Sequence, residues 1–386
     1  MKHMLKFFCL FVGLSNLLAE NIYAIPAFAR KYSMTCKTCH APFPKLKPYG
    51  DEFAGNGFVL KDKDAPRYYL ETGDSELSLL RDIPVALRLE GYVNYNNAKS
   101  KQMDLTSPYI LKLMSGGELT KNVSYYFYFF YSERGEVAGI EDAFVMYNDL
   151  FGSNLDFYIG QFQVSDPLFK RELRLTFEDY QIYKTKIGSS TADLSYDRGI
   201  MLTYGFETGT DITLEILNGA GIGPANAARN FDDDKNKNVA GRVSQDISKN
   251  VRFGGIGYYG KERKSGFTNS LWMAGGDATL AIEPLEFNFQ YLQRKDKNPS
   301  FVAGADDIKT QGAFGELILM PNGDDSKWYG VGMFNWVKSD SAAVNYKSVT
   351  GHFGYMLKRN IRLAAEYTYN FTNKFGKLGA GMILAF

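Results

Sequence analysis

The stretch Cys36-Lys37-Thr38-Cys39-His40 brings two thiols and an imidazole close together in the chain. Thiols at this spacing can each add to a vinyl group of one haem, while the adjacent histidine ligates the iron. The whole chain has three Cys and three His, so chance is a poor explanation for this cluster. The motif predicts one covalently attached haem c, with Cys36 and Cys39 as the thioether residues and His40 as the proximal iron ligand.

Two other uses of the motif are weaker. A CxxC pair can form a redox disulfide, but that chemistry is typical of a βαβ context and gives His40 no role. A zinc site needs further Cys or His ligands, and the sequence offers none nearby. Haem attachment is the hypothesis that uses all three side chains.

The first 24 residues have the features of a secretory signal peptide. A basic start precedes an apolar stretch over residues 7–18, and Ala24 ends a plausible cleavage site. Cleavage after residue 24 would remove His3 and Cys9 and leave the two motif thiols. Export also fits haem attachment outside the cytoplasm.

Residues 25–80 are predicted to form the haem segment. Proline follows the motif at positions 42, 44 and 48, which favours an extended stretch before a short helix within residues 51–58. A segment this short rarely supports its own core, so we expect it to dock against the rest of the chain. No His or Met lies between residues 41 and 102, so the distal iron ligand is expected from the barrel, from Lys or Asn, or from water.

From residue 84 to residue 386 the chain alternates apolar and polar side chains. In the clearest example, Leu363, Ala365 and Tyr367 alternate with Arg362 and Glu366. Charged residues at the inner positions are typical of a wet barrel lumen and unlike a packed sandwich core. The composition agrees, with 26 Tyr, 29 Phe, 38 Gly, a net charge of +1 and a mean hydropathy of −0.26.

The predicted fold is all-β, a transmembrane antiparallel barrel of about sixteen strands with the haem segment docked in or at its lumen. The terminal Phe386 on an apolar last strand agrees with an outer-membrane barrel; a soluble β protein is the alternative. We expect strands at 84–97, 105–118, 122–132, 138–148, 155–163, 196–206, 210–219, 238–248, 250–262, 268–281, 284–295, 307–320, 326–338, 344–357, 360–371 and 375–386.

The connections between these strands alternate in length. Short turns carry Asn122, Asn250 and Asn360, a residue suited to a left-handed backbone, and fall at one end, which we assign to the periplasm. The link over residues 164–195 is too charged for a lipid-facing strand. It could fold into the lumen as a constriction lined by Lys170, Arg171 and Arg174, or it could be an exposed loop.

The alternation over residues 344–357 turns His352 and Met356 inward, near the predicted periplasmic end where the haem segment enters. Either side chain is a candidate distal ligand of the haem iron. An ordinary polar lumen residue is the alternative for His352. Met114 and Met201 are lesser candidates by the same argument.

Further residues surround the motif in a recognisable pattern. They are Pro26-Ala27-Phe28-Ala29-Arg30-Lys31-Tyr32, Phe43-Pro44-Lys45-Leu46, Gly50-Asp51-Glu52-Phe53 and Asn56-Gly57-Phe58. With Cys36, Cys39 and His40, this pattern resembles the fused monohaem cytochrome–porins of bacterial outer membranes. The resemblance implies a haem segment followed by a barrel, and is architectural only beyond residue 58. The group includes oxidases of extracellular ferrous iron.

These features predict an electron-transfer protein in the outer membrane of a Gram-negative bacterium. One haem would pass electrons between an extracellular donor or acceptor and a periplasmic carrier, with ferrous iron as a specific donor. Because tunnelling falls off steeply with distance, the haem segment is expected to plug or line the lumen. Outer-sphere transfer needs no catalytic acid, base or nucleophile.

Two alternatives remain at this point. One is a porin whose haem segment is a plug or sensor, and the other is a haem enzyme with an open sixth iron position. The predicted partners are outer-membrane lipid, a periplasmic electron carrier and an extracellular redox partner. The net charge of +1 gives no case for nucleic acid.

Overall fold

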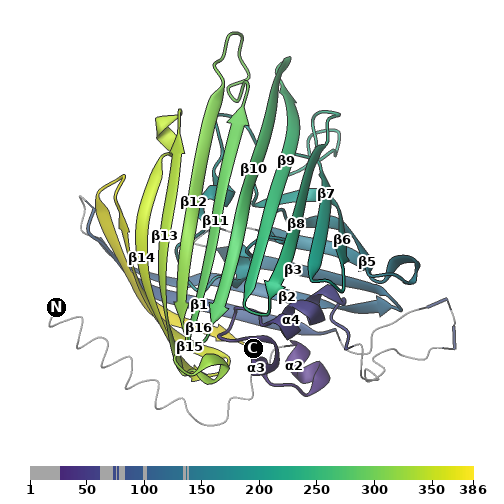
Figure 1. Cartoon of the computed structure of the whole chain (residues 1–386), viewed down its shortest axis with the longest axis vertical. Coiled ribbons are helices and arrows are strands. Elements are labelled where there is room, and N and C mark those ends of the chain that lie inside the picture. The colour runs from purple at the N-terminus through teal and green to yellow at the C-terminus, as the bar shows by residue number, and fades with distance from the viewer. Residues whose placement is uncertain are drawn as a thin grey trace.

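The computed structural model describes residues 27–60, 73–74, 76–77, 83–98, 102–133, 136 and 139–386. The predicted signal peptide lies outside the described residues, as does much of the second half of the predicted haem segment. The described strands close into one antiparallel barrel in which sequence neighbours pair and the first strand pairs with the last (Figure 1). The predicted sixteen-stranded barrel is confirmed.

The strand ends differ from the predicted ranges by no more than three residues. The strands are β1 (Val85–Asn96), β2 (Gln102–Thr120), β3 (Val123–Glu133), β4 (Gly139–Tyr147), β5 (Leu155–Gln163), β6 (Tyr196–Gly205), β7 (Thr210–Leu217), β8 (Asn238–Ser248), β9 (Val251–Lys264), β10 (Phe267–Ile282), β11 (Leu285–Asp296), β12 (Ile308–Leu319), β13 (Trp328–Ser339), β14 (Tyr346–Lys358), β15 (Ile361–Asn370) and β16 (Phe375–Ala385).

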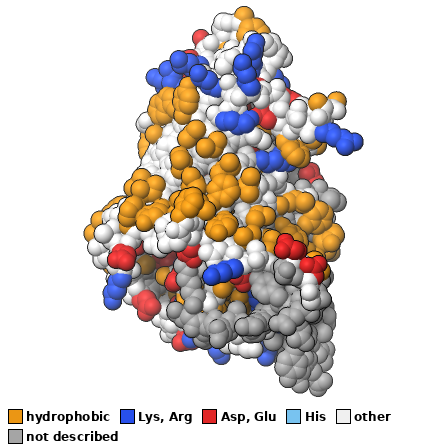
Figure 2. All heavy atoms as spheres, turned by 90° about the vertical axis from the view of Figure 1, so that its right-hand side faces the viewer, with side chains coloured by type: hydrophobic (Ala, Val, Ile, Leu, Met, Phe, Trp, Pro, Cys, Tyr) orange, Lys and Arg blue, Asp and Glu red, His pale blue; other side chains and the backbone are white. Residues whose placement is uncertain are grey.

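The two faces of the wall differ as the alternation requires. On β14, Val349 and Phe353 point outward and are 45% and 47% exposed, whereas Thr350 and His352 point inward and are buried. Exposed apolar side chains recur on the other strands, and on the face that Figure 2 shows they form an apolar band with basic side chains gathered above it. Such a band is what a transmembrane barrel presents to lipid.

The short turns lie at the end that we assign to the periplasm. Asn122 has the predicted left-handed backbone, with φ of 65°. The other two turn asparagines bind neighbouring strands instead. The Asn360 side-chain amide donates to the Ala385 carbonyl at 2.9 Å, and the Asn250 carbonyl accepts from the Ala281 N–H at 2.8 Å.

Three short helices lie at this same end of the barrel (Figure 1). They are α2 (Ala27–Tyr32), α3 (Cys36–Cys39) and α4 (Pro48–Gly55). The helix expected within residues 51–58 begins earlier, at Pro48. Proline is favoured in the first turn of a helix, because the backbone N–H that it lacks would have no partner within the helix there. Among the described residues, no helix is long and apolar enough to cross a membrane.

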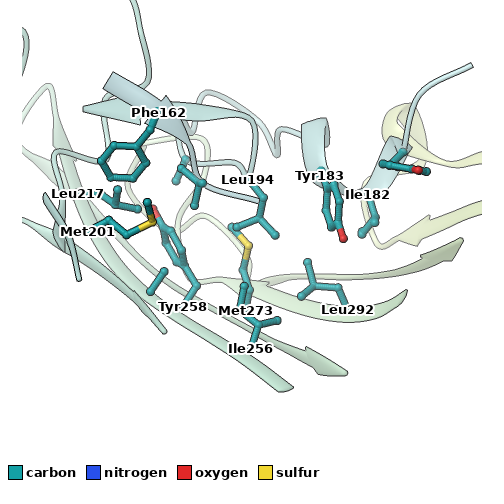
Figure 3. Close-up of a cluster of buried hydrophobic side chains, with 14 of the residues drawn as sticks. Phe162, Ile182, Tyr183, Leu194, Met201, Leu217, Ile256, Tyr258, Met273 and Leu292 are labelled. Carbon is teal, nitrogen blue, oxygen red and sulfur yellow. The ribbon is translucent and has the colours of Figure 1, made fainter. Parts of the chain in front are cut away.

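The link over residues 164–195 folds into the lumen, so the inward alternative is the one observed. The link contains two short 3-10 helices, η2 (Arg171–Leu173) and η3 (Gln181–Lys184). Three further 3-10 helices lie elsewhere in the described part of the chain: η1 (Leu150–Gly152), η4 (Gly323–Asp325) and η5 (Ala342–Val344). The apolar side chains of the link pack against the inner wall in one buried cluster (Figure 3). Labelled members are Ile182, Tyr183 and Leu194 from the link, and Tyr258, Met273 and Leu292 from the wall.

Candidate functional site

The motif cysteines form a single helical turn, α3. The His40 N–H donates to the Cys36 carbonyl at 2.9 Å, which closes this turn and places the histidine directly after it. Both thiols are free and partly buried, and burial raises the pKa of each. Cys36, Cys39 and His40 line one cavity, so the structure brings together the three residues that the sequence singled out.

A folded-back loop fixes the imidazole of His40. The Ala41 N–H donates to the Lys45 carbonyl at 3.1 Å, and the Lys47 N–H donates to the Cys39 carbonyl at 2.9 Å. This loop brings the Pro44 carbonyl to 2.8 Å from His40 Nδ1. Because a carbonyl can only accept, the proton sits on Nδ1, and Nε2 keeps its lone pair.

The protonation state of His40 suits a metal ligand. Burial lowers its pKa to about 4, against the opposing effect of the Pro44 hydrogen bond, so the ring is neutral near pH 7. Neutral imidazole, with its other nitrogen held by a carbonyl, is the form that ligates iron. The sequence does not predict this loop. The one feature that indicates a change of chain direction there is the pair of prolines after the motif.

Helix α4 packs closely on the motif through Gly50. A Cβ at this position would overlap the Cys39 carbonyl and crowd the Leu46 side chain. Because glycine has no Cβ, helix α4 can pack directly against the backbone of the motif.

The cavity lies between the N-terminal helices and the inner wall of the barrel. Its volume is about 290 Å³, and most of its lining is apolar or aromatic. Wall residues in the lining include Met114, Tyr126, Met146, Tyr158 and Met201. Two thiols, a neutral imidazole and a large apolar void are the surroundings that a covalently attached haem requires, so the residues fit this group.

Polar contacts tie the N-terminal helices and their connecting loop to the barrel mouth. Lys45 pairs with Glu286 at 2.8 Å, the buried Arg362 donates to the Phe43 carbonyl at 2.8 Å, and the Asn148 amide donates to the Gly55 carbonyl at 2.6 Å. Ion pairs of Lys37 with Asp325 and of Lys47 with Asp324 add to them. Residues of the 27–60 segment therefore contact the barrel at its mouth.

Replacing Gly57 with Ala is expected to loosen this docking. Gly57 has φ of 69°, and a Cβ there would overlap the Ser124 hydroxyl and the Asn148 side chain. The left-handed backbone alone costs a non-glycine residue about 1–2 kcal/mol. Limited proteolysis should cut within residues 27–60 several-fold faster in this variant than in the wild type.

Gly55→Ala is the matched control, because a Cβ at Gly55 meets no atom within 4 Å. Equal proteolysis of the two variants would show that Gly57 does not hold the segment.

The candidate distal ligands fall in different places. His352 has both ring nitrogens engaged, Nε2 at 3.2 Å from the Tyr329 hydroxyl and Nδ1 at 2.9 Å from Glu366 Oε2. It is absent from the lining of the large cavity, whereas Met114 and Met201 are part of it. Met356 lines a separate small cleft of about 10 Å³, together with Cys36 and His40. The distal ligand stays a prediction.

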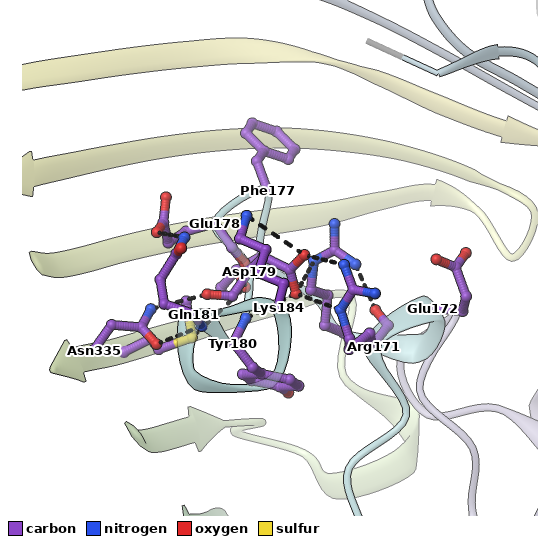
Figure 4. Close-up of polar contacts among 12 residues, drawn as sticks. Arg171, Glu172, Phe177, Glu178, Asp179, Tyr180, Gln181, Lys184 and Asn335 are labelled. Atoms are coloured by element: carbon purple, nitrogen blue, oxygen red, sulfur yellow. Dashed lines mark hydrogen bonds and ion pairs between the residues drawn. The ribbon is translucent and has the colours of Figure 1, made fainter. Parts of the chain in front are cut away.

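The basic residues of the inward link lie close to carboxylates, and one of them also lines the large cavity. Arg171 makes a bidentate pair with the buried Asp179, at 2.6 and 3.2 Å (Figure 4). Burial alone would raise the pKa of Asp179, but Arg174 and Arg171 together hold it well below its usual range. Lys170 lines the large cavity and lies 3.9 Å from Asp51 of helix α4.

The link is also anchored by a carboxylate of the barrel wall. Glu366 accepts the backbone N–H groups of Phe177 and Glu178, at 2.6 and 2.8 Å, and also binds His352. His352 therefore belongs to the network that holds the link in the lumen. This network joins residues far apart in sequence and was not foreseen.

Comparison with solved structures gives the class of barrel. The anion-selective porin from Comamonas acidovorans is 13% identical, with a TM-score of 0.57 over 79% of this chain and 99% of that chain. The outer-membrane channel DcaP of Acinetobacter baumannii is 13% identical, with a TM-score of 0.57 over 79% and 97%. Outer-membrane OmpT of Vibrio cholerae is 10% identical, with a TM-score of 0.54 over 79% and 97%.

The architecture is thus the barrel of the outer-membrane porins. No protein-family model matches the chain, and no curated protein matches its sequence. The porin barrel and the outward apolar band support the predicted location in the outer membrane of a Gram-negative bacterium.

Proposed function

We propose that this protein is an outer-membrane electron-transfer protein that carries one haem c in the periplasmic half of its barrel. The observation that carries the proposal is the state of His40. Its Nδ1 proton is donated to the Pro44 carbonyl, and the ring lines the same cavity as the thiols of Cys36 and Cys39. When bound, the haem would supply one-electron redox chemistry.

The position of the cavity supports a conduit role. The N-terminal helices lie on one side of it, and Asp166, Lys170, Glu172 and Leu173 of the inward link contribute to its lining. A haem at this place would be shielded from lipid and nearer to the extracellular side than one held outside the barrel. A periplasmic carrier and an extracellular donor or acceptor would be its partners, with ferrous iron as the specific donor that the sequence resemblance suggests.

A second candidate function is solute passage, with the haem segment as plug or sensor. The likeness to porins favours it. The inward link packs against the wall in one apolar cluster and therefore takes up part of the lumen, which would narrow a path for solute. A single-channel conductance comparable to that of an open porin would show that solute passage is the main role.

Reduction across a sealed membrane tests the conduit. The holoprotein is inserted in liposomes, a membrane-impermeant reductant is added outside, and haem absorbance is followed. We expect reduction without detergent in vesicles whose barrels expose their extracellular end. A haem that stays oxidised in vesicles, yet is reduced at once after solubilisation, would refute the transmembrane role.

The enzyme alternative has its own readout. Rapid binding of carbon monoxide to the reduced haem would indicate an open sixth position, as the enzyme hypothesis requires.

A further inference from the structure

A second cavity lies next to the first and is lined by four basic side chains. Its volume is about 30 Å³, and Arg88, Lys112, Arg174 and Arg362 line it together with three carboxylates. Arg88, Lys112 and Glu172 also line the large cavity that contains the motif. The two cavities therefore meet at these three side chains.

Three guanidinium nitrogens around this second cavity have no hydrogen-bond partner among the described residues. They are the buried Nε atoms of Arg88, Arg174 and Arg362. Buried donors are nearly always paired, with protein or with a bound group. Three such donors around one cavity point to an acceptor that enters it.

The strand register places Arg88 directly opposite Lys112 on β1 and β2. Like charges in this position repel each other. Each has one carboxylate partner, since Arg88 pairs with Glu90 and Lys112 lies 2.9 Å from Glu172. With Arg174 and the fully buried Arg362 added, the lining holds four basic and three acidic side chains. This excess of positive charge favours an anionic ligand.

We propose that Arg88, Lys112 and Arg362 form the site that holds the propionate carboxylates of the haem. The inference rests on the proposed function, because it presupposes a haem joined to Cys36 and Cys39. A haem fixed by thioether bonds at one edge presents its two carboxylates at another. Carboxylates accept strong charge-assisted hydrogen bonds from guanidinium and ammonium groups.

The arrangement has a consequence for the redox potential. A positive charge close to the haem stabilises the reduced form, which carries one more electron, over the oxidised form. Because the site is buried and shielded from solvent, this effect is only weakly screened. Arg88 and its neighbours therefore raise the potential, and their removal lowers it.

Potentiometric titration of Arg88→Gln holoprotein tests the proposal. We expect the ratio of reduced to oxidised haem at a fixed potential to fall about tenfold, a shift of about 59 mV for one electron. Arg88→Lys, which keeps the charge, should restore most of the wild-type potential. Resonance Raman spectra should show altered propionate bending modes in Arg88→Gln.

Arg242→Gln is the matched control. Arg242 is also an inward-facing barrel arginine paired with a carboxylate, Asp277, and it lines neither cavity. Its removal should leave the potential and the propionate modes unchanged. Equal shifts in Arg88→Gln and Arg242→Gln, or no shift in either, would overturn the proposal.

The outcomes separate this inference from the proposed function. A chain without covalent haem refutes the proposed function, whereas haem that is attached but indifferent to Arg88 refutes only the propionate site. Should Arg88→Gln fail to fold, Lys112→Gln is expected to lower the redox potential as well. An unchanged potential in that variant would count against the propionate site. A free anion in the cavity would instead make the wild-type potential depend on added inorganic phosphate, which would also overturn the proposal.

Discussion

Replacement of Cys36 and Cys39 together by Ala is expected to abolish covalent haem completely. The two thiols are the only side chains of the motif that can form thioether bonds. His40 alone could hold iron only through a reversible bond. Haem staining of membrane fractions after denaturing electrophoresis measures the result, and we expect no signal at the size of this protein.

Thr38→Ala provides the control for this variant. Thr38 lies between the cysteines within α3, and its replacement keeps both thiols and the histidine. Haem staining should equal that of the wild type. Full staining in the double cysteine variant would refute haem attachment at this motif.

Replacement of Asp179 by Ala is expected to destabilise the protein by about 3–5 kcal/mol, the usual effect of removing one partner of a buried ion pair. Asp179 is 2% exposed, accepts hydrogen bonds from Arg171 and lies 3.9 Å from Arg174 Nε, too far for a hydrogen bond. Without it, the buried Arg171 and the partly buried Arg174 lose a counter-charge, and the inward link loses its central anchor. Urea unfolding of the barrel in lipid vesicles measures the change.

Asp307→Ala is the comparison for a surface pair. Asp307 contacts Lys295 at 2.7 Å but is exposed to solvent, so its loss should shift the unfolding midpoint little. If both variants unfold at the same urea concentration, the buried pair does not anchor the link.

The same carboxylate predicts a pH dependence. The pKa of Asp179 is lower in the folded protein than in the unfolded chain. Its stabilising contribution is therefore complete above the unfolded pKa of about 3.9 and is lost as the pH falls below that value. The difference in unfolding free energy between wild type and Asp179→Ala should shrink between about pH 4 and pH 2. A difference that stays constant over this range would exclude the ion pair as its source.

The barrel could be predicted from the sequence because alternation is a local signal with an unambiguous period. Residues 155–163 and 238–248 were predicted as strands with the bounds that the structure gives. A water-filled lumen favours polar residues at the inward positions, and lipid favours apolar residues at the outward ones. The inward and outward faces of each strand can therefore be recognised from the sequence. The motif residues were equally visible, since the chemistry of haem attachment fixes their spacing.

The surroundings of the motif could not be predicted in the same way. The Pro44 carbonyl reaches His40 only because the loop between them folds back, and no periodic pattern encodes that fold. The bond from Phe177 to Glu366 spans 189 residues of sequence. Local patterns placed His352 on the inner face correctly, but they could not show that Glu366 and Tyr329 occupy its ring nitrogens.

The seam between β1 and β16 has a consequence for how the molecule matures. Barrel closure joins the last strand to the strand that directly follows the N-terminal helices, and Phe386 pairs its backbone with Leu87 there. A porphyrin in the large cavity would be confined once the wall has closed and the inward link has settled. We therefore expect haem ligation in the periplasm to precede closure of the sheet.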